Sequence, residues 1–341
     1  MRRIVGKDKK GRNVLINVPS YDDMYINNQF GPQTAYNIAI SSNGSGSSDS
    51  STPVVSNTQK AIFGYGGGAA YYSITNLVSN IGVVATDTTG VGTARSNLAA
   101  AGYGTDKAIF GYGFNNSGYL SMTNLVSNTG VVATNTTGVG TARADLAAAG
   151  YGTDKAIFGY GSTGANVSVT NLVSNTGVVA IDTTGVGTAR NRLAAAGYGT
   201  DKAIFGYGQS AVSQVSITNL VSNTGVVGNN VTGVGSARQD LAAAGYGTDK
   251  AIFGYGFTNI AVSLSNLVSN TGVVATDTTG VGTARYTLAA AGYGGDKAIF
   301  GFGSGNTAIT NLVSSTGVVA TDTAGVGTGR SQLAAAGYSL T

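Results

Sequence analysis

Four residue types are missing from this chain of 341 residues, which contains no cysteine, histidine, tryptophan or glutamate. Without cysteine the chain can form no disulfide, no thiol nucleophile and no zinc–thiolate site. Without histidine it lacks the commonest general base and metal ligand, so neither a Ser-His-Asp triad nor a Cys-His pair can form. These absences predict a protein that is not an enzyme and that holds no cofactor and no metal.

Charged residues and long apolar runs are also scarce. Only 10% of the residues are charged, and the net charge is +4. Six basic residues lie in the first twelve positions and nearly all the others occur once per repeat, so the basic excess does not predict a nucleic-acid partner. No apolar run approaches the roughly 18 residues of a membrane span. No hydrophobic segment follows the basic N-terminus, so we expect neither a membrane span nor a signal peptide.

The dominant feature of the sequence is a repeat of 47 or 48 residues. A Lys-Ala-Ile-Phe-Gly motif starts near positions 60, 107, 155, 202, 250 and 297, which gives six units. Each unit contains four short runs typical of β-strands, such as 98–104, 107–113, 121–128 and 130–136, with turn residues between them. A four-stranded sheet of roughly 40–50 residues is one blade of a β-propeller. We therefore predict an all-β fold, a six-bladed propeller over residues 60–341.

The composition of the runs suggests which strand lies where. Alanines such as Ala99–Ala101 suit the crowded axis of a propeller, and Gly102 would let neighbouring backbones come close. Six larger side chains of one unit would fill the space between blades: Ile109, Phe110, Leu125, Val126, Val131 and Val132. A linear array of separate hairpin modules is the alternative, but it would leave sheet edges exposed.

The phase of the repeat favours a closed ring. The repeated region begins on the second strand of a unit, at Lys60, and its last segment is a first strand, Leu333–Tyr338. If Leu333–Tyr338 pairs with Lys60–Gly64, the first unit gains its missing strand and the C-terminal strand closes the ring. An open solenoid would not need this offset.

One stretch carries a resemblance to a known family. Residues 93–113, TARSNLAAAGYGTDKAIFGYG, combine an Arg, a small-residue strand, a turn and an apolar strand that ends in glycines. This pattern resembles the kelch repeat, with Arg95, Gly111 and Gly113 at the positions of its Arg and double glycine. Over residues 60–341 the resemblance implies a kelch-like propeller, although Gly-Tyr-Gly replaces Gly-Gly and the family's Trp is absent. The repeats also resemble those of phage-encoded virion proteins, which implies a fibre or decoration protein made in the host cytoplasm.

Residues 1–59 do not belong to the repeat. Residues 1–40 are basic and aromatic, and we interpret them as an extended docking arm that binds other virion proteins. Residues 41–59 have the Ser/Gly-rich composition of a linker. The predicted docking residues are Arg2, Arg3, Tyr21, Tyr25 and Phe30.

The invariant polar residues have two interpretations. One Arg per unit would place six guanidinium groups around one face, as in an anion-binding mouth. Strict repetition favours a structural role instead, in which each Arg binds nearby carbonyl groups or the loop Asp of Thr-Asp-Thr-Thr-Gly. The Asp of each Gly-Thr-Asp-Lys turn likewise indicates a turn former rather than a catalytic acid.

Variation between units points to a recognition surface. The units differ in the connection between their second and third strands and in the pair of residues after each Arg, such as Ser96-Asn97. Because the strands alternate in direction, both variable sets should emerge on one face, where loops on a rigid scaffold carry specificity. The predicted binding residues are Tyr71, Tyr72, Phe114, Tyr119, Arg192, Phe257 and Tyr286.

Three functions remain open. The favoured one is a non-enzymatic virion protein whose N-terminal arm anchors a propeller that projects from the capsid or tail. The second is an adhesin that uses the variable face to bind a host surface glycan or protein. The third is a propeller enzyme, for which Asp145, Arg192 and Asp240 are the only unit-specific charges on that face.

Overall fold

The computed structural model describes residues 2–7, 13–18 and 59–338 of a chain that divides into two units, Met1–Val54 and Val55–Thr341. In the first unit, β1 (Arg2–Lys7) and β2 (Asn13–Val18) form an antiparallel pair. Every regular element in the described residues is a β-strand. The described residues therefore contain no helix long and apolar enough to cross a membrane.

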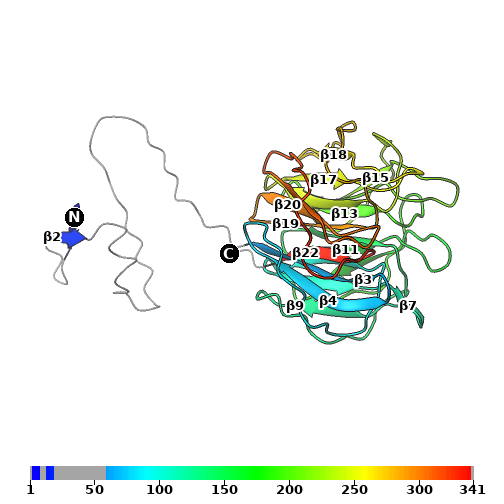
Figure 1. The fold of residues 1–341 in the computed structure, drawn as a ribbon, viewed down its shortest axis with the longest axis horizontal. Helices are drawn as coiled ribbons and strands as arrows, with labels where there is room; N and C mark the ends of the chain where they lie inside the picture. The colour runs from blue at the N-terminus through cyan, green and yellow to red at the C-terminus, as the bar shows by residue number, and fades with distance from the viewer. Residues whose placement is uncertain (1, 8–12, 19–58, 339–341) are drawn as a thin grey trace. The chain divides into compact units, whose positions relative to one another are not determined.

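The second unit repeats one small antiparallel sheet of three strands, and six such sheets lie in the described residues (Figure 1). The inner strands are β5 (Ala99–Tyr103), β10 (Ala147–Tyr151), β13 (Ala194–Tyr198), β16 (Ala242–Tyr246), β19 (Ala289–Tyr293) and β22 (Ala334–Tyr338). The middle strands are β3 (Lys60–Gly67), β6 (Lys107–Gly111), β11 (Lys155–Gly159), β14 (Lys202–Gly206), β17 (Lys250–Gly254) and β20 (Lys297–Gly301). The outer strands are β4 (Tyr71–Val78), β9 (Thr123–Val126), β12 (Thr170–Val173), β15 (Thr218–Val221), β18 (Ser265–Val268) and β21 (Thr310–Val313). An added two-stranded ribbon joins β7 (Phe114–Asn115) to β8 (Gly118–Tyr119).

The inner and middle strands form a hairpin whose turn explains the Gly-Thr-Asp sequence. In the sheet of β5 and β6, the last pair before the turn is Tyr103 with Lys107. Gly104 and Thr105 then take φ angles of +59° and +68°, a left-handed conformation in which glycine costs least. Asp106 follows and accepts a 2.6 Å hydrogen bond from the ammonium group of Lys107.

One sheet combines the two ends of the repeated region. β22 pairs with β3 from Ala334 opposite Gly64 to Tyr338 opposite Lys60, the pairing that the phase of the repeat predicts. In Figure 1 the red strand β22 accordingly lies beside the blue strand β3. The register is the same as in the other five sheets, where each hairpin is continuous in sequence.

The inner strands pack side by side, and their small residues allow it. β5 contacts β10 and β22, and the same contact joins each further pair of consecutive inner strands. A Cβ atom on Gly102 would lie 3.1 Å from the carbonyl oxygen of Gly337, closer than nine in ten real Cβ contacts. Glycine at this position therefore allows the two backbones to approach closely. All-β sheets repeated around such a centre make the fold β-propeller-like.

Hydrophobic residues of adjacent sheets form the core between them. Phe110 packs against Tyr65 of the preceding sheet with ring centroids 5.1 Å apart, and both residues are fully buried with Val126. The prediction for Val131 is wrong, because its side chain is 65% exposed. Val131 ends a turn in which Ser127 binds its backbone, and the alternation of side chains turns the next residue, Val132, inward instead.

The predicted fourth strand of each unit is reduced to isolated bridges. In the sheet of β9, the following segment pairs only at Val126 with Val132 and at Thr123 with Thr136. The side chain of Asn124 donates a 3.0 Å hydrogen bond to the carbonyl of Ala133, in a position where a strand would offer backbone pairing. The amide side chain replaces the ladder, so the sheet stops at three strands.

Candidate functional site

The invariant arginines are buried and structural. Arg95 is completely buried, and its guanidinium group lies 4.3 Å from the centre of the Tyr65 ring. It donates hydrogen bonds to the carbonyls of Tyr112 and Thr93 and to the side chain of Asn124, at 2.8–3.0 Å. All six arginines have this cation–π contact. They stabilise the joint between sheets and cannot form an anion-binding mouth, in agreement with the structural interpretation of the repeat.

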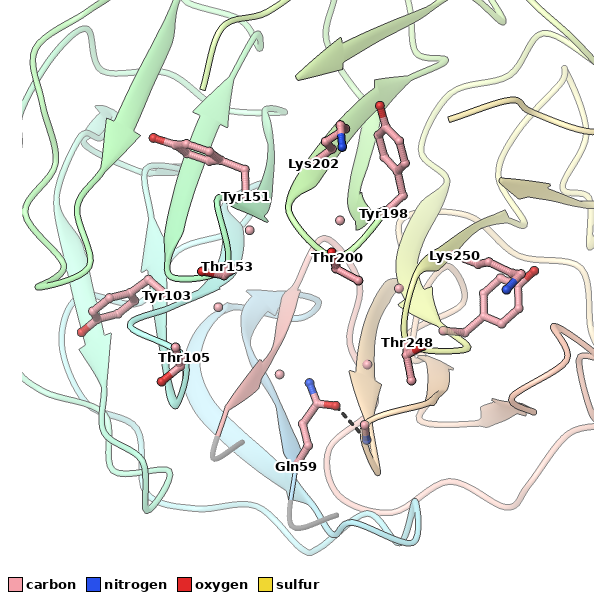
Figure 2. A pocket seen from close by; sticks show the side chains of 18 of the residues that line it. Gln59, Tyr103, Thr105, Tyr151, Thr153, Tyr198, Thr200, Lys202, Thr248 and Lys250 are labelled. Atoms are coloured by element: carbon pink, nitrogen blue, oxygen red, sulfur yellow. Dashed lines mark hydrogen bonds between the residues drawn. The ribbon is translucent and has the colours of Figure 1, made fainter. Parts of the chain in front are cut away.

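The Gly-Thr-Asp turns surround a cavity of about 290 Å³. Thr105, Thr153, Thr200 and Thr248 stand around it, each from a successive turn (Figure 2). The lysines of these turns carry no free charge into the cavity, because each of Lys107, Lys155, Lys202, Lys250 and Lys297 pairs with the Asp before it at 2.6–2.9 Å. We call the surface formed by these turns the invariant face.

Gln59 fixes the chain at the edge of this cavity. Its backbone carbonyl accepts a 2.9 Å hydrogen bond from the amide of Gly294, and its side-chain Oε1 accepts one of 2.8 Å from Gly295 (Figure 2). In the four preceding turn contacts, a backbone carbonyl of Asp takes the place of Gln59, as between Gly104 and Asp154. Gln59, the first described residue of the repeated region, therefore lies on the invariant face.

The variable residues gather at the opposite ends of the inner strands. In five of the six units, the first residue after the Arg forms a bridge with the chain at the end of the middle strand, as Ser96 does with Phe114 and Gln239 with Phe257. Equivalent bridges join Ala144 to Ser162, Asn191 to Gln209 and Ser331 to Gly67. An inner strand such as β5 begins beside Asn97 at this end and runs to the Gly104 turn at the other. We call this second surface the variable face.

The predicted aromatic residues lie in three separate groups on the variable face. Phe114 and Tyr119 form an edge-to-face pair at 5.3 Å across β7 and β8, and Phe257 and Tyr286 pair at 5.1 Å. Tyr71 and Tyr72 belong to strand β4 rather than to a loop, because they pair with Gly67 and Gly66 beyond an irregularity at Gly64–Gly66. Tyr119 is the most exposed of these side chains, at 37%, and the others are half-buried.

The second residue after each Arg forms a circle of hydrogen bonds at the centre of the variable face. The amide of Asn97 donates to the carbonyl of Gln332, and five more bonds of 2.8–2.9 Å lead around the circle back to Asn97. We call the six residues the axial polar ring: Asn97, Asp145, Arg192, Asp240, Thr287 and Gln332. Each has a φ angle between +52° and +55°. With the six leucines that follow them, they line a cavity of about 90 Å³.

The charges of the axial polar ring are adjacent. Arg192 lies between Asp145 and Asp240 in the circle, and its Nε is 4.0 Å from Oδ1 of Asp240. Burial raises the pKa of Asp240 to about 7, against the lowering effect of Arg192, and the charge of Asp145 raises it further. Burial also raises the pKa of Asp145, opposed by Arg192. One guanidinium group thus serves two carboxyl groups that are poorly solvated.

The sequence predicted Asp145, Arg192 and Asp240 as the unit-specific charges of the variable face, but it did not predict that they are neighbours in one circle, and Gln59 was not predicted. The available signal for Gln59 was Gly295, the residue that replaces the threonine of the other turns. Among the predicted docking residues, Arg2 and Arg3 belong to strand β1. Tyr21, Tyr25 and Phe30 fall outside the described residues.

No family model matches the chain, and no curated protein has a significantly similar sequence. Within residues 2–7, 13–18 and 59–338, no three acidic side chains come together as metal ligands. The geometry of the chain itself must therefore carry the functional argument.

Proposed function

We propose that this protein is a non-enzymatic structural component of a bacteriophage virion, in which residues 1–40 dock to other virion proteins and a closed six-bladed, kelch-like propeller projects from the capsid or tail. The observation that carries the proposal is that Gln59 and the unit-specific residues lie at opposite ends of the inner strands. Gln59, the first described residue of the repeated region, is bound on the invariant face, whereas the unit-specific residues lie on the variable face. A protein anchored to a particle through residues 1–40 would then present the variable face away from the particle.

Ring closure is supported by contacts between distant parts of the repeated region. Arg330 donates to the carbonyl of Tyr65 and to Asn76, more than 250 positions away in sequence. Arg95, Arg143, Arg238 and Arg285 make the equivalent two bonds to residues 17–29 positions away. Asp87 accepts hydrogen bonds from Thr328 across 241 positions. The sixth blade would therefore be held by the same interactions as the other five.

A non-enzymatic role fits the chemistry of both cavities. The cavity of the invariant face is surrounded by threonines and by lysines that are already paired with aspartates. The cavity of the variable face holds two carboxyl groups, but one guanidinium group lies between them and no histidine or thiol exists to act with them. The geometry supports binding better than catalysis.

Incorporation into particles tests the proposal. The phage that carries the gene would be grown without it and supplied with either the full chain or a chain lacking residues 1–40. We expect the full chain in purified particles and the truncated chain only in the unassembled fraction, although both keep the repeated region folded. Truncated protein in the particles would refute docking by the arm, and absence of the full chain would refute the virion assignment.

An adhesin is the second candidate, because two aromatic pairs occupy the variable face. Exposed ring faces beside polar side chains can stack on sugars or anchor a protein partner. If the protein binds a host glycan, replacing Phe114 and Tyr119 by alanine should remove binding on a glycan array. Replacing the exposed Asn116 of the same connection should leave it intact.

A further inference from the structure

The axial polar ring differs from its surroundings in sequence. The leucine after each ring residue is present in all six units, whereas the ring itself contains Asn, Asp, Arg, Asp, Thr and Gln. The six backbones are nearly identical, with φ angles of +52° to +55° and one closed circle of hydrogen bonds. Backbone geometry therefore does not explain why the side chains differ, and three charged ones lie next to one another.

The ring has an excess of one carboxyl group. Asp145 and Asp240 lie on either side of Arg192, and the remaining members, Asn97, Thr287 and Gln332, carry no charge. The side chain of Asp240 is only 13% exposed, whereas that of Arg192 is 44% exposed. A further cation stabilises the charged form of a carboxylate that is poorly solvated and shares its counterion with another carboxylate. The half-exposed guanidinium group can move toward solvent and leave room for one.

The cavity restricts the kind of cation. Its volume of about 90 Å³ is roughly three times the share of one water molecule in the liquid, and six leucines that are 5–6% exposed lie below the polar residues. Two carboxyl groups provide few of the six to eight oxygens that calcium takes, and the adjacent positive charge of Arg192 opposes a divalent cation such as calcium or magnesium. An ammonium group on a short alkyl chain matches both the polar residues and the leucines of the cavity. Its N–H groups can donate to the carboxylates while its methylene groups cover the leucines.

We propose that the axial polar ring binds the alkylammonium group of a ligand, with the nitrogen between Asp145 and Asp240 and the alkyl chain against the leucines. Arg192 competes with this ligand for the carboxylates and moves toward solvent when it binds. The inference rests on the proposed function, because it gives the ligand chemistry of the centre of the variable face.

Calorimetric titration of the full chain with n-propylammonium tests this inference. Asp145→Asn and Asp240→Asn should each weaken binding by about ten-fold or more, since each removes a charged hydrogen-bond acceptor. Asp154→Asn is the matched control, because it makes the same change in an exposed turn of the invariant face. Arg192→Gln should strengthen binding. Tetramethylammonium, which has no N–H donor, should bind at least ten-fold more weakly to the unchanged chain.

The direction of the Arg192→Gln effect separates the inference from its alternatives. If the ring instead binds an anion, acetate will bind and Arg192→Gln will abolish that binding, which overturns the inference. Absence of n-propylammonium binding to both the unchanged chain and Arg192→Gln, or binding unaltered by both aspartate substitutions, also overturns it. In each of these cases the proposed virion function stands if the full chain still enters particles and the chain without residues 1–40 does not.

Discussion

Backbone hydrogen bonds join successive sheets on both faces of the repeated region, but the two faces carry different side chains. On the invariant face, hydrogen bonds lead from turn to turn, as from Gly104 to Asp154, and the same threonine recurs around the cavity until Gly295. On the variable face, the circle from Asn97 to Gln332 carries five residue types. The comparison teaches that hydrogen bonding of the backbone holds both faces together, which leaves the side chains of one face free to differ.

Substitution of a buried and of a half-exposed arginine should give the largest difference in stability between scaffold and variable residues. Arg238 is buried and donates to Tyr255 and Asn266, so Arg238→Met leaves buried polar groups without partners. We expect a loss of about 3–5 kcal/mol in the free energy of unfolding, measured by chemical denaturation. Arg192→Met is the comparison, and it should cost less than Arg238→Met, because its side chain is half-exposed and Asp240, left without this counterion, can bind a proton near neutral pH. Equal losses from the two substitutions would contradict the division into scaffold and variable residues.

The raised pKa of Asp240 predicts a pH dependence of stability opposite in sign to that of invariant-face aspartates such as Asp154, whose pKa is lowered. Its folded pKa of about 7 lies above the ordinary aspartate value of 3.8, so between these values the folded state binds more protons than the unfolded state. The stability contributed by this group is greatest below pH 4 and falls as the pH rises to 7. Asp240→Asn should therefore stabilise the protein at pH 8, by at most about 4 kcal/mol, and should have little effect near pH 4.

Thermal unfolding of Asp240→Asn at the two pH values measures this effect. Asp154→Asn, in an invariant turn where the hydrogen bond from Lys155 lowers the pKa of the carboxyl group, is the control and should show no gain at pH 8. A melting temperature for Asp240→Asn that equals or falls below that of the unchanged chain at pH 8 would argue against a poorly solvated carboxyl group.

Gly111 tests the packing between sheets. A Cβ atom at this position would lie 2.7 Å from Cζ of Phe158, and Gly111 has no positive φ angle that would complicate the result. Gly111→Ala should cost about 1–3 kcal/mol in a denaturation experiment, because a ring in a packed core must move. Asn116→Ala, in an exposed variable connection, should change stability by less than about 0.5 kcal/mol. A neutral Gly111→Ala would show that the joint between sheets is loosely packed.

Gln59 predicts the smallest effect on stability. Gln59→Ala removes the side-chain acceptor for the amide of Gly295 but keeps the backbone bond to Gly294. We expect a loss of about 0.5–1.5 kcal/mol. Hydrogen exchange should show faster exchange at Gly295 while the amide of Gly104, which donates to Asp154, stays unchanged. An unchanged exchange rate at Gly295 would mean that the Gln59 side chain does not hold the chain on the invariant face.

Most of the fold could be predicted because it follows from local and periodic signals. Turn residues gave the hairpin of β5 and β6, and the phase of the repeat gave the pairing of β22 with β3. The fourth strand could not be excluded from its apolar pattern, since Asn124 replaces backbone pairing through its side chain. The variable residues after each Arg were predicted to share one face, but the circle that joins them could not be predicted, because it depends on a left-handed backbone conformation at each of the six positions.

The orientation of the protein on assembled particles tests the central claim most directly. Cryo-electron microscopy of purified particles should resolve the repeated region with Gln59 and the invariant turns toward the particle, and with the axial polar ring toward solvent. Density in the opposite orientation, with the axial polar ring against the particle surface, would contradict the account of an anchored invariant face and an outward variable face.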